Sequence, residues 1–274
     1  MYILSAVLEK DRCNVALLNE KYEVLSKKSG GCSEVNELCS TLLTEKGIKS
    51  DEVKYLGVGA DYSYGNPCDL ASQIEDKIGF KTYGASLISA RALGEAYVSS
   101  DLPYLTLLKI DDTVECGIVI DKKVYAGVHQ LGGRVAHFVI DFDGFECDCG
   151  RKGCFEAYAS VSGLRRIARE AGVEVADTLT HKELFAMNTP EAEKAKKTYI
   201  QYIGNGITNV INLFQPNDLV LEGPFTEAGD ELMTELMEFI LRAQYTHSLP
   251  NKCNIRFAKY DEDIAIIGAA LLGR

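Results

Sequence analysis

The sequence predicts an α/β fold. Two sets of strands are each followed by helical segments, which is the element order of α/β proteins. The first set lies within residues 2–59 and the second within residues 103–126. A chain of 274 residues can also bury two cores of ordinary size. We therefore expect two α/β domains, with the boundary in the segment 101–104 that contains Pro103.

Runs of apolar residues mark the strands. Residues 2–8 and 14–19 predict a β-hairpin whose turn is Glu9-Lys10-Asp11-Arg12, and residues 53–59 predict a buried strand. Further strands are expected at residues 103–110, 115–120, 122–126, 218–222 and 254–258.

Helical spacing and capping residues mark the helices. Between Asn66-Pro67 and Gly79, apolar residues recur at every fourth position, which predicts one helix that ends at the glycine. Thr189 as N-cap and Pro190 at the first helical position predict a long helix to about Phe214. Helices are also expected at 86–99, 155–171, 228–245 and 263–272, and Thr180 to Glu183 has capping-box spacing.

Composition and charge exclude several classes of function. The net charge of −11, without a dense stripe of Lys and Arg, opposes nonspecific binding to nucleic acid. No apolar run is long enough to span a membrane, and the N-terminal residues predict a strand and not a signal peptide. The nine cysteines are an odd count, and most are scattered, which favours a reducing compartment. We expect a cytoplasmic protein that does not associate with membranes.

One short stretch carries the most specific chemistry. His137, Cys147, Cys149 and Cys154 offer one imidazole and three thiolates, the ligand set of a closed tetrahedral zinc site. Gly150 and Gly153 permit the sharp reversals that bring the cysteines around one ion. A redox thiol group or a chance cluster would account for the cysteines alone, but not for the histidine and both glycines. The stretch therefore predicts a structural zinc.

The pattern C-x-C-G-x-x-G-C-x-E with an upstream histidine resembles the zinc signature of the ROK family (repressors, open reading frames and sugar kinases). This resemblance implies an actin-like ATPase fold, with a cleft between two α/β domains and a final helix that packs on the N-terminal domain. The implied domains are residues 1–102 plus 261–274, and residues 103–260. Family repressors carry a helix-turn-helix before the first strand, and we expect none in this chain; family members commonly form homodimers. We expect a homodimer that does not bind nucleic acid by itself.

The phosphate loops that the resemblance implies are altered. Relatives carry D-x-G-G-T between the opening strands, where this chain has Ser5 to Arg12 without glycine or threonine. The second loop, G-T-G-x-G-G-G, reads Asp111 to Gly117 here and keeps only its last glycine, and Glu222-Gly223-Pro224 replaces a triple-glycine turn. Each carboxylate about 4 Å from a phosphate would oppose it by roughly 4 kcal/mol before screening. Bound ATP or Mg²⁺ is therefore not expected.

The catalytic aspartate of the family is also missing. Aligned on Leu93-Gly94-Glu95, the family segment N-D-x-N-x-A-x-L-G-E places Leu87 at the position of the base, and no acidic residue lies between Ile78 and Gly94. Leucine cannot accept a proton. Asp61 is an alternative base in principle, although its neighbours Tyr62-Ser63-Tyr64-Gly65 favour a turn residue.

The sugar-binding residues of the family are partly retained. In relatives, the Glu and His of G-E-x-G-H and the last Glu of the zinc signature contact the sugar. Here His137 and Glu156 match, whereas Arg134 replaces the first Glu. Arg134 would either bind an anionic sugar or pair with Glu156 and close the pocket. We assign no role to His129, His181 or His247, which are typical of surface or packing positions.

The sequence therefore predicts a zinc-containing member of this family without a catalytic base, with a carbohydrate-binding or regulatory role. A small carbohydrate or a sugar phosphate is the expected ligand. The alternatives are an active ATP-dependent kinase of a hexose or N-acetylhexosamine, and a transcriptional regulator.

Overall fold

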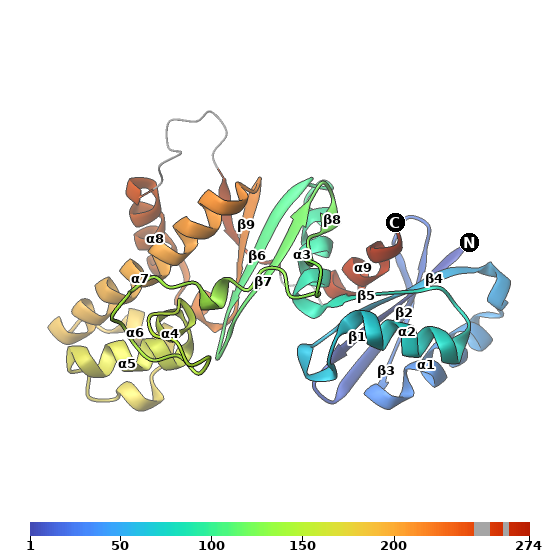
Figure 1. The fold of residues 1–274 in the computed structure, drawn as a ribbon, viewed down its shortest axis with the longest axis horizontal. Coiled ribbons are helices and arrows are strands. Elements are labelled where there is room, and N and C mark those ends of the chain that lie inside the picture. The colour runs from blue at the N-terminus through green and yellow to red at the C-terminus, as the bar shows by residue number, and fades with distance from the viewer. Residues whose placement is uncertain (244–252, 260–262) are drawn as a thin grey trace. The chain divides into compact units, whose positions relative to one another are not determined.

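The computed structural model describes residues 1–243, 253–259 and 263–274, and the chain forms two compact α/β units (Figure 1). The first unit comprises Met1–Leu105, Gly117–Gly133 and Lys259–Arg274. The second comprises Thr106–Cys116 and Arg134–Ala258. The final residues of the chain thus belong to the same unit as the first strand.

A five-stranded sheet of order β3-β2-β1-β4-β5 organises the first unit. Its strands are β1 (Tyr2–Glu9), β2 (Arg12–Asn19), β3 (Val24–Gly31), β4 (Val53–Ala60) and β5 (Thr82–Ser86). Strands β1, β2 and β3 pair antiparallel, while β1, β4 and β5 pair parallel. The predicted hairpin is confirmed, but its turn is shorter, because Glu9 and Arg12 still pair and only two residues connect the strands.

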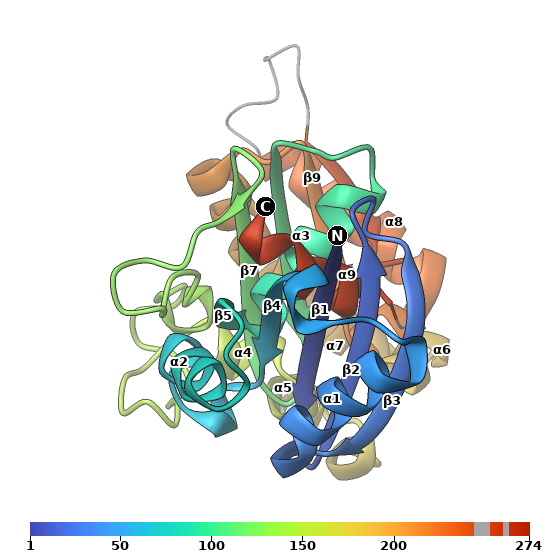
Figure 2. The ribbon, with the colours of Figure 1, turned by 90° about the vertical axis from the view of Figure 1, so that its right-hand side faces the viewer.

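Helices cover both faces of this sheet (Figure 2). α1 (Val35–Lys46) and α2 (Pro67–Ile78) bury one face, where they pack on Leu4 and its alternate neighbours along β1. α3 (Leu87–Val98) and α9 (Ile264–Ala270) lie on the other face, where they pack on Ile3 and Val7. Successive residues of a strand point to opposite faces, so β1 supplies a core to each helical layer.

Two glycines allow α3 and α9 to pack against each other. A Cβ atom at Gly268 would lie 1.7 Å from the Ala90 carbonyl oxygen, and one at Gly94 would lie 2.0 Å from that of Ile264. No side chain fits at such distances, so both positions require glycine. The C-terminal helix is thereby docked on the N-terminal sheet, as the family resemblance implied.

The second sheet has the order β10-β9-β6-β7-β8. Its strands are β6 (Tyr104–Ile110), β7 (Val114–Ile120), β8 (Lys123–Val124), β9 (Asp218–Glu222) and β10 (Asn254–Phe257). The helices of the second unit are α4 (Glu156–Ala159), α5 (Val161–Ala171), α6 (His181–Ala186), α7 (Pro190–Phe214) and α8 (Gly229–Ala243). β9 and β10 run parallel.

The single helix predicted for residues 155–171 was wrong, because α4 and α5 are separate helices. Ser160 has extended backbone angles, and its side chain accepts a hydrogen bond from the Gly163 amide as the N-cap of α5. The predicted helix end at Gly79 and the capping predictions at Thr180 and Thr189 are confirmed, and Asn66 is the N-cap of α2.

Three elements, β3, α1 and β5, lie outside the segments assigned above from the sequence. His247 and the predicted end of α8 at residue 245 lie outside the described residues. Within the described part of the chain, no helix has the length and apolarity to cross a bilayer.

Candidate metal centre and ligand site

The four predicted metal ligands lie on two connected segments of the second unit. His137 ends a short 3₁₀ turn, Val135–His137, and the three cysteines lie on the following loop before α4. An isolated β-bridge between Val139 and Cys154 brings the two segments together. A left-handed backbone at Gly150 (φ 85°) makes the reversal between Cys149 and Cys154.

The ligand atoms converge. All four lie within 4.8 Å of one another. Cys149 Sγ lies 3.5 Å from Cys154 Sγ, and Cys147 Sγ lies 3.8 Å from His137 Nδ1. Around a tetrahedral zinc with Zn–S of about 2.3 Å and Zn–N of about 2.0 Å, the ligand atoms are roughly 3.5–3.8 Å apart. The donor set and the spacing therefore fit Zn²⁺, whereas sulfur atoms 3.5 Å apart are too distant for a disulfide.

The three thiols have unequal proton affinities. Burial raises the pKa of Cys154 to about 12 and also raises the pKa of Cys147. A hydrogen bond from the Arg151 backbone amide lowers the pKa of the exposed Cys149 to about 7. A bound divalent cation stabilises thiolates directly. Cys149 is therefore the thiol most readily ionised at neutral pH. Cys147 and Cys154 need a bound cation to lose their protons.

A column of aromatic side chains supports the metal loop from outside. Phe145 of the loop stacks on Tyr158 at 4.5 Å between ring centroids, and Tyr158 stacks on Tyr202 at 3.9 Å. The Tyr158 hydroxyl donates to Asp141 Oδ2 at 2.8 Å and accepts from the Phe145 amide at 2.9 Å. Tyr202 donates to the same carboxylate oxygen at 3.1 Å. These contacts fix Asp141 and Phe145, which lie on the segment between His137 and Cys147.

Glu156 is bound to a neighbouring turn, not to Arg134. Its Oε2 accepts a hydrogen bond from the Val114 amide at 2.9 Å. Arg134 is exposed, and among the described residues no ion pair joins it to Glu156. The arrangement in which these two residues close the pocket is therefore not found. Arg134 lies directly before the turn that ends at His137, and Glu156 is the first residue of α4.

A sequence model of the ROK family matches residues 33–274. The chain belongs to the ROK family. The xylose repressor of Bacillus spizizenii is 29% identical over 172 residues, which cover 61% of this chain and 44% of the repressor. Sugar kinases are also among its curated relatives. The chain spans about half the length of the xylose repressors that it matches.

Solved ROK structures share the fold. The ROK hexokinase of Thermus thermophilus has a TM-score of 0.82 at 21% identity, covering 99% of this chain and 97% of the hexokinase. The Streptomyces griseus ROK glucokinase, solved with glucose and AMPPNP, has a TM-score of 0.68 at 17% identity, covering 98% of each chain. The two α/β units of this ROK protein thus have the actin-like ATPase fold.

The segment that the family resemblance assigns to the first phosphate loop is a regular hairpin. Strand pairing continues to Glu9 and Arg12, and only Lys10 and Asp11 form the turn. A phosphate cradle of this type needs backbone amides that are approached closely, which glycine permits. Side chains occupy every one of these positions here.

The segment that the family resemblance assigns to the second phosphate loop is held by contacts within the second unit. The Asp111 amide donates to the Thr113 carbonyl at 3.0 Å, and the Asp111 carbonyl accepts from the Val161 amide at 3.0 Å. Lys109 pairs with Glu115 at 3.3 Å and offsets one of the three acids expected there. Together with the bond from Glu156 to Val114, these contacts tie the turn to α4 and α5.

Leu87 is the first residue of α3. The preceding Ser86 caps the helix by accepting a hydrogen bond from the Ser89 amide. The leucine side chain is partly buried and packs on the core beneath α9. Asp61, the alternative acid, caps a short 3₁₀ turn by accepting from the Ser63 amide at 2.8 Å. His129 is exposed, and His181 is buried.

Proposed function

We propose that this ROK protein does not transfer phosphate from ATP and instead has a carbohydrate-binding or regulatory role. The observation that carries this proposal is Leu87, which packs on the core at the position where the family resemblance places a base. Catalysis of phosphoryl transfer depends on positioning and on electrostatic stabilisation of charged phosphates. The regular hairpin at Glu9 to Arg12 and the acids at 111–115 supply neither.

Zinc, in this proposal, is held by His137, Cys147, Cys149 and Cys154 and is structural. Four protein ligands close a tetrahedral ion and leave no position for a substrate. The ion would fix the end of the 3₁₀ turn at His137 and the start of α4. Glu156 and Arg134 flank those two points in sequence, so zinc supports both of them.

The proposed ligand is a small carbohydrate or a sugar phosphate, recognised by His137, Glu156 and Arg134. Its support is the match of His137 and Glu156 to the family's sugar-binding positions, together with the glucose in the Streptomyces griseus relative. Arg134 is a donor with a fixed positive charge, which favours an anionic ligand over a neutral one. The active protein is proposed to be a cytoplasmic homodimer, with domains at residues 1–102 plus 261–274 and 103–260.

Two alternatives have relatives that favour them. An active sugar kinase is supported by the kinases among the curated relatives, and a transcriptional regulator by the xylose repressors. They differ in measurable ways, because a kinase consumes ATP in the presence of its sugar and a regulator binds DNA in a way that responds to a ligand.

The deciding experiment is a coupled ADP-release assay with Mg-ATP and glucose, N-acetylmannosamine or N-acetylgalactosamine, using zinc-loaded protein. We expect no sugar-dependent ADP release. Leu87→Asp restores an acid at the base position and is the matched variant. Sugar-dependent turnover by the wild-type chain that is lost when a nucleotide competitor is added would overturn the proposal.

Calorimetry then separates the two ligand classes. Glucose, N-acetylmannosamine, a hexose 6-phosphate and a sugar acid are titrated into the wild-type chain and into Arg134→Glu. We expect anionic sugars to bind better than neutral ones, and the variant to reverse that order. No heat from any of the four sugars would exclude a carbohydrate site and leave a partner-binding role.

A further inference from the structure

The three cysteines of the metal loop differ in their exposure to solvent. Cys149 is exposed, whereas Cys147 is 9% exposed and Cys154 is fully buried. The tip of the loop is open as well, because a Cβ atom at Gly150 would meet no atom within 4 Å other than those of its chain neighbours. Oxidation of cysteine follows exposure and thiolate character. Cys149 is therefore the metal ligand that a dissolved oxidant reaches first.

Cys154 is placed to react with an oxidised Cys149. The two sulfur atoms lie 3.5 Å apart, and a disulfide needs them about 1.5 Å closer, a movement that rotation of the side chains can supply. The Cys147 sulfur is instead directed to His137 Nδ1, at 3.8 Å. The exposed thiol thus has a buried thiol as its partner, and the third thiol remains with the histidine.

Backbone contacts hold the loop without help from these sulfur atoms. The Cys147 amide donates to the Arg151 carbonyl at 2.8 Å, and the Gly153 amide donates to the Phe145 carbonyl at 2.7 Å. The Arg151 side chain donates to the His137 carbonyl oxygen. Because none of these bonds involves a thiol, the loop can keep its path while two of its cysteines change their redox state.

We propose that Cys149 and Cys154 are an oxidation-sensitive pair, which hydrogen peroxide converts to a disulfide with release of the zinc. The proposal rests on the zinc site proposed above. In the first step the Cys149 thiolate attacks one peroxide oxygen, so that an S–O bond forms, the O–O bond breaks and hydroxide leaves. In the second step the Cys154 thiolate attacks the sulfur of this sulfenic acid, the S–S bond forms and a second hydroxide leaves. The two sulfur atoms together lose two electrons, which reduce the peroxide.

Formation of this disulfide removes two of the four metal ligands. The thiolate is the form of cysteine that binds metals, and neither sulfur of a disulfide is a thiolate. His137 and Cys147 alone do not make a closed tetrahedral site. Loss of the ion would release the His137 ring and the chain at Cys154, which is followed by Phe155 and the start of α4. Oxidation would therefore reversibly loosen the two segments that the proposed carbohydrate site depends on.

The test exposes the full zinc-loaded chain to hydrogen peroxide. Released zinc is measured with a chromophoric chelator against an untreated sample, free thiols are counted, and the disulfide is mapped by mass spectrometry of peptides. We expect one zinc to be released per chain as two of the nine thiols are lost. The map should link Cys149 to Cys154. A dithiol reductant with added zinc should restore the metal content.

Two variants assign the effect to the exposed thiol. Cys149→His keeps four possible zinc ligands and removes the exposed thiolate, so it should retain its zinc at a peroxide exposure that strips the wild type. Cys68→Ser is the matched control, because it removes a partly exposed cysteine of the first unit. It should release zinc as the wild type does.

Several results would overturn the proposal. Zinc-loaded protein that keeps its zinc while its other thiols oxidise is one, and release that accompanies a different disulfide is another. Equal release from Cys149→His and the wild type is a third. If that variant binds no zinc, the peptide map of the wild type still decides. Untreated wild-type protein without zinc would contradict the metal site itself, and elemental analysis before oxidation separates that failure from the others.

Discussion

His181 makes the stability of this protein sensitive to acid. The residue begins α6 and is only 1% exposed. Tyr199 donates its hydroxyl hydrogen to the Ala159 carbonyl at 2.8 Å, so its oxygen accepts from His181 Nε2, also 2.8 Å away. Burial, with a smaller contribution from Arg165, lowers the pKa of His181 from 6.5 to about 4. The folded protein therefore keeps this histidine neutral well below the pH at which the unfolded chain protonates it.

The sign and size of the effect follow from proton linkage. Between pH 6.5 and 4 the unfolded chain binds one more proton at this residue than the folded chain, so acid favours unfolding. The free energy of unfolding falls by about 1.4 kcal/mol per pH unit in that window. From about pH 7 to pH 4.5, the contribution of His181 amounts to a loss of about 2 kcal/mol. The stability contributed by neutral His181 is fully present above pH 6.5, the ordinary pKa of histidine, and is lost as the pH falls toward 4.

His181→Gln removes this titration and keeps a side chain that donates a hydrogen bond. Urea unfolding is followed by circular dichroism, because the chain has no tryptophan. Carboxylates and zinc ligands titrate in both proteins and cancel in the comparison. We expect the variant to lose about 2 kcal/mol less than the wild type between pH 7 and 4.5. His129→Gln, at an exposed position, is the control and should follow the wild type. Parallel stability curves for wild type and His181→Gln would refute the reasoning.

Three further predictions concern the metal loop and the nucleotide. The protein should contain one zinc by elemental analysis. Cys154→Ala should abolish zinc binding and lower the free energy of unfolding by more than about 3 kcal/mol. Cys116→Ala, at a buried position outside the metal loop, is the control and should keep the metal. Tyr158→Phe removes the hydroxyl that fixes Asp141 and should weaken zinc binding about 10- to 100-fold in a competition with a chromophoric chelator; the exposed Tyr125→Phe should not. Millimolar Mg-ATP should leave the melting temperature unchanged in scanning fluorimetry. A ligand at 100 times its Kd would add about 2.7 kcal/mol to the free energy of unfolding. A melting temperature that rises with the concentration of Mg-ATP would contradict this prediction.

Local sequence signals predicted much of the fold. The caps at Asn66 and Thr189 are short-range devices, since each side chain bonds to an amide two or three residues later. The metal cluster is equally local, because its three cysteines and two of its glycines lie within eight residues, 147–154. Helix α1 also carried a signal, with Val35, Cys39 and Leu42 at helical spacing before Gly47.

Other features depend on tertiary contacts that no short window contains. Ser160 divides a segment that is helical on both sides, and the division ties the Val161 amide to the Asp111 carbonyl fifty residues earlier. The burial of His181 is set by Tyr199 and Phe225, which come from α7 and the segment after β9. Neither partner can be identified by spacing, so the sequence did not distinguish a surface position from a packing position for this histidine.

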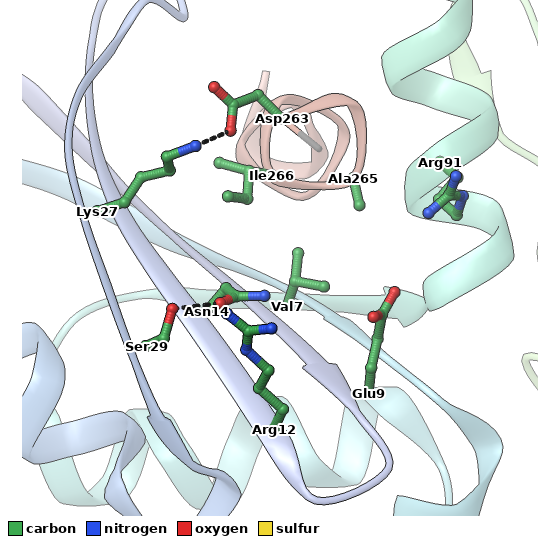
Figure 3. A pocket seen from close by; sticks show the side chains of 10 residues that line it. All are labelled: Val7, Glu9, Arg12, Asn14, Lys27, Ser29, Arg91, Asp263, Ala265 and Ile266. Atoms are coloured by element: carbon green, nitrogen blue, oxygen red, sulfur yellow. Dashed lines mark hydrogen bonds and ion pairs between the residues drawn. The ribbon is translucent and has the colours of Figure 1, made fainter. Parts of the chain in front are cut away.

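The hairpin of β1 and β2 shows how one difference in sequence from the family pattern has two consequences. A phosphate loop works through its backbone, and its glycines leave no side chains near the ligand. With Glu9, Lys10 and Asp11 in place of glycine, the strands pair to the end of the hairpin. The same replacement makes the alternation of a β-strand apply there, so Glu9 and Arg12 project beside Arg91 of α3 and Asp263 before α9 (Figure 3). Regular pairing of the hairpin and the projection of its side chains are thus two results of the same difference in sequence.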